Sequence, residues 1–272
     1  MLVVLHLTGP ERKDLRKSKK LCPMNSHRTQ GHPFDIDSRV ESFHWWFAGR
    51  RKLLSSLLSS VPLSRGALAL DVGCGVGSNL ATLTSMGLRV VALDLSFEAL
   101  LLAQKRYKSS FINANLNQLP ILPNSVGLIL ATDILEHLQD DLAGIISLRH
   151  PLREEGILIV TVPAFRFLWG IQDRVTGHQR RYDRKEIVDK LERGGFEVLR
   201  SSYFNIFLFF PIFIARGIMR FVKPKIPSEN VLNTPILNSL LKAVFSIEPF
   251  LLKYLSFPFG VSIFCVARKR RP

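Results

Sequence analysis

The sequence is short of cysteine. Its 272 residues include only Cys22, Cys74 and Cys265, which are widely separated and form no C-x-x-C pair. This excludes a disulfide framework, gives no sign of a zinc site and is typical of a reducing compartment, so we expect a cytoplasmic protein. The opening MLVVLHLTGP is too short an apolar run for a signal peptide and has no basic residue before it.

Acidic residues are also scarce: Asp and Glu number 22 against 37 Lys and Arg, for a net charge of +15. The excess is concentrated at the two ends, within residues 1–33 and in the basic run 268–271. Basic ends fit an anionic membrane surface at least as well as a nucleic acid. Solvated charge without any partner is the third reading.

No apolar run is long enough to span a bilayer. The segment 206–215 (IFLFFPIFIA) has ten apolar residues, whereas a spanning helix needs about 20. A second apolar stretch, 236–255, carries Asn238, Lys242 and Ser246 on one side of a helix. These patterns predict either helices that pack on the sheet or form a dimer surface, or helices that lie in a membrane interface. The second reading places the protein peripherally on the inner membrane face.

The remaining sequence alternates between short apolar strands and helical segments. This alternation predicts an α/β fold, with a doubly wound, Rossmann-like, mostly parallel sheet of seven strands and helices on both faces. About 55 residues separate the last two strands, far more than a hairpin needs, so a helical insertion is expected there. The expected divisions are a disordered basic leader (1–33), a helical lead-in or lid (34–66), a cofactor-binding core (67–203), the apolar insertion (204–258), and a last strand with a basic tail (259–272).

A glycine-rich turn follows the first strand, 68–72. Gly73, Gly75 and Gly77 allow the backbone to approach a ligand closely, and parallel sheets of this kind bind ligands at the carboxyl edge. Asp94 ends the second strand, and its carboxylate can accept hydrogen bonds from both hydroxyls of a ribose. NAD is the alternative cofactor, but its fingerprint G-x-G-x-x-G requires a third glycine where this chain has Ser78.

These residues resemble the class I S-adenosylmethionine (SAM)-dependent methyltransferases. Residues 71–77 (DVGCGVG) match the first motif of that family, 115–120 (NLNQLP) the motif that flanks adenine, and 133–138 (DILEHL) the motif after the fourth strand. The chain departs from the family at Asn115, where aspartate is usual, and at Gly127, where an acidic residue is frequent. The resemblance implies that SAM is bound by Asp71, Gly73, Cys74, Gly75, Gly77, Asp94, Leu95, Asn115, Leu116 and Asp133.

His137 is the first candidate for a catalytic base, because it follows the fourth strand at the edge where an acceptor should lie. A packing or capping role is the alternative. In some related quinone-precursor methyltransferases a similar cluster holds a divalent metal, and Asp133 and Glu136 would join His137 in such a set here. Because the set is minimal and two of its members are adjacent, we expect no metal.

The second candidate region is 173–182, which resembles the G-H-x-R-R-Y motif of a bacterial and archaeal methyltransferase group. We predict His178 and Tyr182 as catalytic residues and Arg180 and Arg181 as substrate-binding residues, since arginine binds phosphate or carboxylate in a bidentate fork. The same group has an aromatic W-F-x-x-R-R-like lead-in, and Trp46 is predicted to contact substrate. The alternative is a structural ion-pair cluster that ties this segment to the lead-in helix.

The sequence therefore predicts a SAM-dependent methyltransferase acting on a small-molecule, glycan or lipid-linked acceptor, with oxygen as the favoured acceptor atom. One alternative is a nucleic-acid methyltransferase, suggested only by charge; the N/D-P-P-Y/F-type motif of many DNA enzymes is missing after the fourth strand. The other is a non-catalytic, membrane-associated protein on a methyltransferase scaffold. The intact glycines and Asp94 argue against it.

Overall fold

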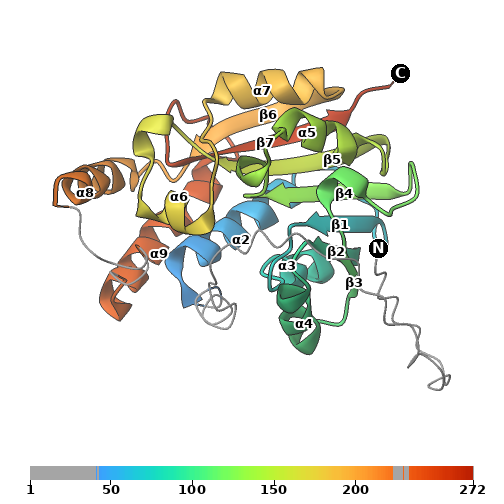
Figure 1. Ribbon diagram of the computed structural model, residues 1–272, viewed down its shortest axis with the longest axis horizontal. Coiled ribbons are helices and arrows are strands. Elements are labelled where there is room, and N and C mark those ends of the chain that lie inside the picture. The colour runs from blue at the N-terminus through green and yellow to red at the C-terminus, as the bar shows by residue number, and fades with distance from the viewer. Residues whose placement is uncertain (1–40, 42, 223–228, 230–232, 272) are drawn as a thin grey trace, which may run out of the picture.

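The computed structural model describes residues 41, 43–222, 229 and 233–271. The predicted disordered leader, 1–33, lies outside these residues, as does the first part of the predicted lead-in. Everything from the lead-in helix to the last strand can be followed in Figure 1, apart from two short gaps near residue 228.

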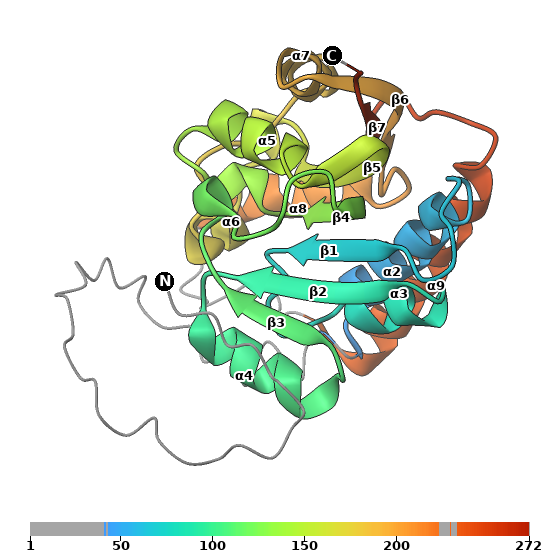
Figure 2. The same ribbon diagram turned by 90° about the vertical axis from the view of Figure 1, so that its right-hand side faces the viewer.

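A seven-stranded sheet forms the centre of the molecule, in the order β3-β2-β1-β4-β5-β7-β6. The strands β1 to β5 pair in parallel, and β7 runs antiparallel to both of its neighbours. The predicted seven-stranded, mostly parallel, Rossmann-like sheet is confirmed (Figure 2). The strands are β1 (Leu68–Val72), β2 (Arg89–Asp94), β3 (Ser110–Asn113), β4 (Val126–Thr132), β5 (Leu152–Pro163), β6 (Phe196–Phe204) and β7 (Ser262–Lys269).

Helices cover both faces of this sheet (Figures 1 and 2). Their register follows local signals in the chain; for example, Ser96 caps α4 by accepting a hydrogen bond from the backbone N–H of Ala99, as predicted. The α-helices are α2 (Trp45–Leu58), α3 (Leu80–Ser85), α4 (Phe97–Arg106), α5 (Asp141–Arg149), α6 (Ile171–Thr176), α7 (Arg184–Arg193), α8 (Phe209–Val222) and α9 (Pro235–Leu251). Short 3-10 turns are η1 (Leu116–Gln118), η2 (Leu135–His137) and η3 (Arg166–Leu168).

Three strands end in unusual backbone at the same edge of the sheet. Asp133 follows β4, Phe165 follows β5 and Asn205 follows β6, with φ angles of 54°, 54° and 60°. Residues other than glycine adopt this left-handed conformation at a cost on the order of 1–3 kcal/mol each. Strained backbone of this kind clusters at active sites and ligand-binding sites. The edge formed by the carboxyl ends of β4, β5 and β6 is therefore the first place to look for a site.

The predicted helical insertion consists of α8 and α9, and α9 packs beside α2 (Figure 1). Two residues of the predicted polar stripe of α9 face α2: Asn238 accepts a hydrogen bond from the backbone N–H of Trp45, and Ser246 accepts one from Lys52, whereas Lys242 is exposed. An apolar stripe on the opposite side is exposed, with Ile236 at 85%. The helix therefore presents apolar side chains outward as well as inward, unlike an ordinary surface helix.

One face of the insertion is packed on the fold and another is exposed, and the membrane contact stays a prediction. Phe245 and Glu248 are fully buried against the rest of the protein, while a run of large apolar side chains stays exposed. No helix among the described residues is both long enough and apolar enough to cross a membrane. The exposed apolar side chains are Phe210, Phe213, Ile214, Ile218, Phe221 and Val222 on α8, and Ile236, Leu237, Leu240, Ile247 and Phe250 on α9.

Candidate active site

The turn between β1 and α3 is shaped by glycine. Gly73, Gly75 and Gly77 have φ angles of 68°, 54° and 91°, a region that glycine enters without steric cost. A Cβ on Gly77 would lie 2.9 Å from side-chain atoms of Leu80 and Tyr107. The turn therefore requires glycine at these positions, and it exposes backbone to whatever lies at the sheet edge.

Asp71 at the end of β1 is fully buried and only half satisfied. Its Oδ1 accepts a hydrogen bond from Asn79, while its Oδ2 has no partner. Burial raises the pKa of Asp71 to about 7, against the opposing influence of Asn79 and Arg50. A buried carboxylate with a free oxygen is stabilised by a cationic group, so this residue fits the role that the family resemblance gives it, beside an amino group.

Asp94 lies across the turn from Asp71. Its two oxygens accept hydrogen bonds from the backbone N–H groups of Gly75 and Ser96, at 2.7 and 2.8 Å. Each carboxylate oxygen has two lone pairs, so both remain able to accept a hydroxyl. Leu95 is 71% exposed beside it, and this corner fits a ribose. The chain's residues therefore fit SAM at the carboxyl ends of β1 and β2.

The other predicted cofactor residues lie along the same edge. Asn115 is exposed, and its side chain accepts from the N–H of Asn117, so it caps η1. Leu116 is buried. Cys74 is also buried, and burial raises the pKa of its thiol well above the usual value, with Asp71 adding to the effect. It is a small packing residue of the turn and not a nucleophile.

Arg50 of α2 reaches over the fourth-strand end, a contact that sequence reasoning missed. Its guanidinium pairs with Asp133 and donates to the hydroxyl of Ser78 at 3.0 Å. Asp133 also accepts a hydrogen bond from Thr161 of β5. The lead-in helix is thereby fixed to the cofactor turn and to β4. The sequence signal for this contact was the basic pair Arg50-Arg51, which follows the aromatic lead-in.

A cavity of about 510 Å³ adjoins this contact. Its floor is formed by the ends of β4, β5 and β7, where Asp133, Pro163 and Ser262 lie, and its walls by α2, α6, α8 and α9. Apolar and aromatic side chains form much of the wall surface, among them Trp45, Trp46, Ile212, Met219, Leu237 and Leu241. Polar and charged side chains such as Arg50, Gln172, Arg216 and Glu229 line the cavity as well. A largely apolar concavity with a few polar groups is the usual form of a small-molecule site.

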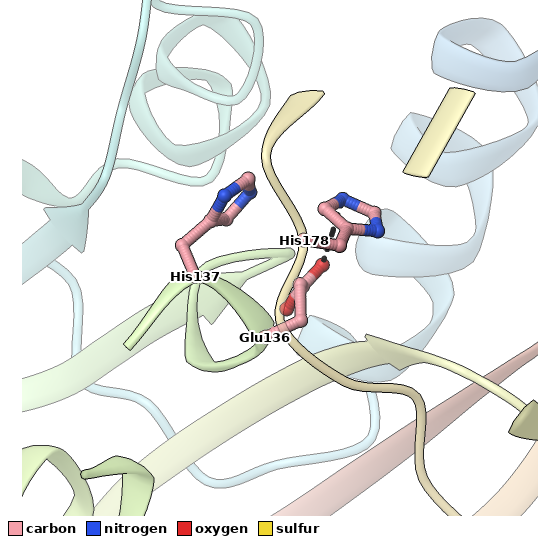
Figure 3. A group of neighbouring side chains, drawn as sticks. All are labelled: Glu136, His137 and His178. Carbon is pink, nitrogen blue, oxygen red and sulfur yellow. Dashed lines mark ion pairs between the residues drawn. The ribbon is translucent and has the colours of Figure 1, made fainter. Parts of the chain in front are cut away.

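Glu136, His137 and His178 all line this cavity, and their side chains stand together (Figure 3). Glu136 is fully buried and neither of its oxygens has a hydrogen-bond partner; its Oε1 lies 3.8 Å from Nε2 of His178. Burial raises its pKa well above the usual range, and the charge of Asp133 adds to this. His137 lies at the outer rim, where partial loss of solvent and the nearby His178 lower its pKa to about 4. His137 is therefore neutral near pH 7.

The same three side chains could hold a metal ion, because one ligand atom of each lies within 4.8 Å of the others. Asp133, which we had considered with Glu136 and His137 as a minimal set, is instead paired with Arg50 and Thr161. The expectation that the protein needs no metal remains a prediction.

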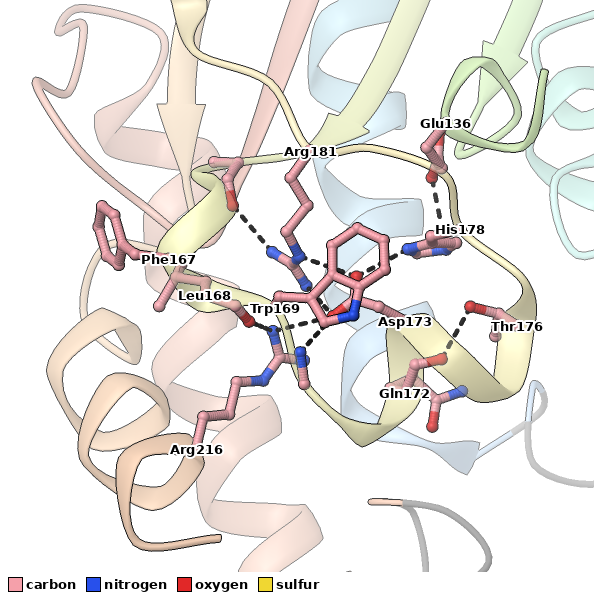
Figure 4. A network of polar contacts seen from close by, with 12 residues as sticks. Glu136, Phe167, Leu168, Trp169, Gln172, Asp173, Thr176, His178, Arg181 and Arg216 are labelled. Atoms are coloured by element: carbon pink, nitrogen blue, oxygen red, sulfur yellow. Dashed lines mark hydrogen bonds and ion pairs between the residues drawn. The ribbon is translucent and has the colours of Figure 1, made fainter. Parts of the chain in front are cut away.

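His178 is held by a buried ionic network centred on Asp173 (Figure 4). Asp173 lies in α6, where we had expected loop, and it accepts hydrogen bonds from Nδ1 of His178 and Nε of Arg181, both at 2.8 Å. Burial alone would raise the pKa of Asp173, but the hydrogen bond from His178 and the charge of Arg181 outweigh it and hold the pKa below its usual value. Asp173 therefore fixes the His178 ring so that Nε2 faces Glu136.

Two predicted site residues have structural positions instead. Tyr182 is fully buried, its hydroxyl donates to Asp141 at 2.8 Å, and it does not line the cavity. Arg180 donates to the carbonyl of Leu138 and pairs with Asp141, also outside the cavity. These side chains join the 178–182 segment to α5 and to the turn before it, and the predicted catalytic role of Tyr182 and the predicted substrate contact of Arg180 stay predictions.

Arg181 and Trp46 do line the cavity. Arg181 is bonded to Asp173 and to the carbonyl of Ala164. An ion-pair cluster is therefore present at this residue, but it ties the segment to α6 and not to the lead-in helix that we had weighed as its partner. Trp46 stacks on Phe204, with ring centroids 5.8 Å apart, and forms part of the wall. Their contact with an acceptor stays a prediction.

Comparison with known proteins agrees with this geometry. Residues 70–160 match the family model described as "Methyltransferase domain". The chain is 30% identical over 175 residues to an uncharacterized protein of Methanocaldococcus jannaschii, covering 63% of this chain and 75% of that one. It is 28% identical to a malonyl-[acyl-carrier protein] O-methyltransferase of Enterobacter lignolyticus, covering 64% and 70%.

Other matches are shorter or structural. A probable SAM-dependent methyltransferase of Mycolicibacterium smegmatis is 29% identical, and the match spans about half of each protein, 49% and 53%. Among solved structures, the complex of the Trm112 activator with a methyltransferase from Haloferax volcanii aligns with a TM-score of 0.60 at 17% identity, covering 88% of this chain and 98% of that one. A likeness at that identity shows the fold.

The fold, the glycine turn and the acidic residues after β1 and β2 define a Rossmann-like SAM-binding domain. The chain belongs to the class I SAM-dependent methyltransferases, and it is an enzyme that uses SAM.

Proposed function

We propose that this methyltransferase modifies an oxygen atom of an acceptor with an extended apolar body, such as a lipid-linked molecule. The observation that carries the proposal is the 510 Å³ cavity, which is lined by the apolar side chains of Trp45, Met219 and Leu241 and by the polar pair Glu136 and His178. Such a cavity would bury an apolar chain and leave a hydroxyl beside the polar pair.

The polar pair adjoins the cofactor edge, because Asp133 of the fourth-strand motif lines the same cavity. SAM, when bound, supplies a methyl group on a sulfonium. The chain must align the acceptor oxygen, exclude water and take its proton. His178 is positioned to take that proton, because Asp173 accepts the hydrogen bond from Nδ1 and Nε2 therefore carries the free lone pair.

Transfer of labelled methyl groups from SAM into membrane-lipid and glycan fractions tests the acceptor class. We expect incorporation into lipid or lipid-linked material. His178→Ala should lower turnover by about 10²–10⁴-fold, the usual contribution of a general base. His150→Ala is the matched control, since His150 is exposed at the end of α5. Incorporation into free glycans only, or wild-type turnover of His178→Ala, would refute the respective part of the proposal.

We propose further that the exposed faces of α8 and α9 contact an anionic membrane. Their apolar stripes point outward, and α9 carries an exposed Lys242 beside them, with Lys253 just beyond its end. Arg216 does not contribute as a free cation, because it pairs with Glu229, whereas Arg220 donates to backbone carbonyls and keeps its charge. Apolar side chains flanked by lysines suit the interface of an anionic bilayer.

Co-sedimentation with vesicles tests this contact. The chain should bind vesicles that contain phosphatidylglycerol and bind pure phosphatidylcholine less, and the double variant Phe221→Asp/Ile236→Asp should lose most of the binding. Leu122→Asp is the control, because Leu122 is 76% exposed in the segment before β4. Equal binding by all three proteins would overturn the proposal. Deleting 204–257 is a poorer test, since it removes the buried Phe245 and Glu248.

A nucleic-acid acceptor is a weaker candidate, since the basic ends are its only support. It predicts salt-sensitive binding to RNA or DNA, which filter binding would detect. A non-catalytic scaffold is tested by calorimetry with SAM and S-adenosylhomocysteine, because an inactive scaffold need bind neither.

A further inference from the structure

Asn205 is a buried amide without a partner. It follows β6 directly, is fully buried, and lines the cavity, yet neither Nδ2 nor Oδ1 has a hydrogen bond. Its neighbours hold it there. The backbone N–H of Asn205 donates to Oε2 of Glu248 in α9, whose Oε1 accepts from the N–H of Phe207.

Asn205 is expected to lower the stability of the folded protein. A buried amide that loses its hydrogen bonds to water is destabilising, and the φ of 60° adds backbone strain. Glycine at this position would relieve both. The Asn205 side chain thus combines an unpaired buried amide with a strained backbone, and it lines the cavity that receives the acceptor. A bound group that completes the hydrogen bonds of the amide explains this combination best.

Glu136, which lies beyond the end of β4, is another cavity residue whose side-chain oxygens have no hydrogen-bond partner. Two strands, β5 and β7, stand between β4 and β6. Neighbouring strands are about 4.8 Å apart, so the ends of β4 and β6 are separated by about 14 Å. All four strand ends belong to the same edge of the sheet and contribute to one cavity, so a single molecule can reach both groups.

We infer that Asn205 is a specificity-determining residue, which hydrogen-bonds a second polar group of the acceptor, away from the reacting end. An amide both donates and accepts, so the partner group is a hydroxyl, a carbonyl or an amide. This inference rests on the proposed function, because it assumes that an apolar-bodied acceptor occupies the cavity. The inference adds that a second polar group interrupts or ends the apolar body of the acceptor, at a fixed distance from its reacting end.

Paired long-chain probes test this without knowledge of the natural acceptor. 1-Alkanols and α,ω-alkanediols of increasing length are titrated into the full chain with S-adenosylhomocysteine present, and binding is followed by tryptophan fluorescence, since Trp45 and Trp46 line the cavity. We expect the diol to bind about fivefold more tightly than the alkanol, as one net hydrogen bond predicts. The preference should peak at one chain length, at which the second hydroxyl reaches Asn205.

Asn205→Gly is the decisive variant, because glycine tolerates the backbone conformation and retains the N–H to Glu248. It should bind alkanols as the wild type does and lose the preference for diols, whereas Asn205→Asp keeps an accepting oxygen and retains part of it. An unchanged preference in Asn205→Gly, or no preference in the wild type at any length, overturns the inference. Equal, tight binding of both probes leaves the proposed function standing, and failure of both probes to bind the wild type contradicts both proposals.

Discussion

Replacing Asp173 by asparagine should destabilise the protein more than any other isosteric change near the cavity. The carboxylate is fully buried and accepts hydrogen bonds from His178, from Nε and Nη2 of Arg181, and from the backbone N–H of Gly170. Asparagine keeps the shape but removes the charge, which leaves the buried guanidinium of Arg181 uncompensated. Breaking one side of a buried pair costs about 3–5 kcal/mol.

The assay is thermal unfolding of Asp173→Asn beside Asp183→Asn. Each kcal/mol lowers the midpoint by about 2–4 °C in a domain of this size, so the Asp173 variant should melt roughly 6–20 °C below the wild type. Asp183 is exposed and its side chain makes no capping hydrogen bond, so its variant should stay within about 0.5 kcal/mol. A midpoint for Asp173→Asn indistinguishable from that of the control would refute the assigned network.

The pH dependence gives a second check on Asp173. The pKa of Asp173 is lower in the folded protein than its usual value, so its contribution is present above the unfolded value of about 3.9 and is lost as the pH falls further. The variant lacks this contribution at every pH. The difference in unfolding midpoint between the wild type and Asp173→Asn should therefore narrow below about pH 4. A difference that stays constant with pH would contradict the ionised state that we assign to Asp173.

Three further predictions concern the cofactor turn, the insertion and the metal question. Asp94→Ala should weaken binding of S-adenosylhomocysteine by at least tenfold in calorimetry, since hydrogen bonds to a charged group contribute about 1.5–3 kcal/mol each; Gly77→Ala should also weaken it, because the added Cβ would clash at 2.9 Å. Burial raises the pKa of Glu248 to about 7 from 4.5, so stability should fall as the pH rises between these values, and Glu248→Gln should flatten that slope in denaturant titrations. Dialysis against EDTA should leave methyl transfer unchanged if His178 acts as a base, and a loss restored by a divalent cation would show that its cluster holds a metal ion.

The sheet and the cofactor turn could be predicted because their determinants are local. The apolar run of β1, the glycines and Asp94 each act through residues close in sequence, and the turn glycines have the positive φ that their residue type suggests. The cap of α4 at Ser96 was predictable for the same reason. Local signals of this kind need no knowledge of what packs against them.

The acceptor site could not be predicted equally well, since its side chains are assigned by long-range contacts. Tyr182 looked like a substrate residue because it is polar and lies in a connecting segment, yet a bridge between Ala164 and Tyr182 draws that segment onto the sheet and turns the ring toward Asp141. Asn205 carries no motif at all. Its place at the cavity follows only from the sheet order, in which β5 and β7 lie between β4 and β6, and from its backbone contact with Glu248 of α9.

The polar residues of α9 show another limit of prediction from sequence. Asn238, Lys242 and Ser246 were correctly placed on one side of a helix, but periodicity does not tell which side faces water. Asn238 and Ser246 bond to α2, which leaves an apolar stripe exposed on the opposite side.

One consequence of α9 concerns kinetics. The helix forms part of the cavity wall through Leu237 and Leu241, and its neighbouring face, with Ile236 and Leu240, is exposed and apolar. If that face rests in a bilayer, an acceptor would move from lipid to cavity sideways, without passing through water. The concentration that governs turnover would then be the mole fraction of acceptor in the membrane, so adding inert lipid at a fixed amount of acceptor would slow the enzyme.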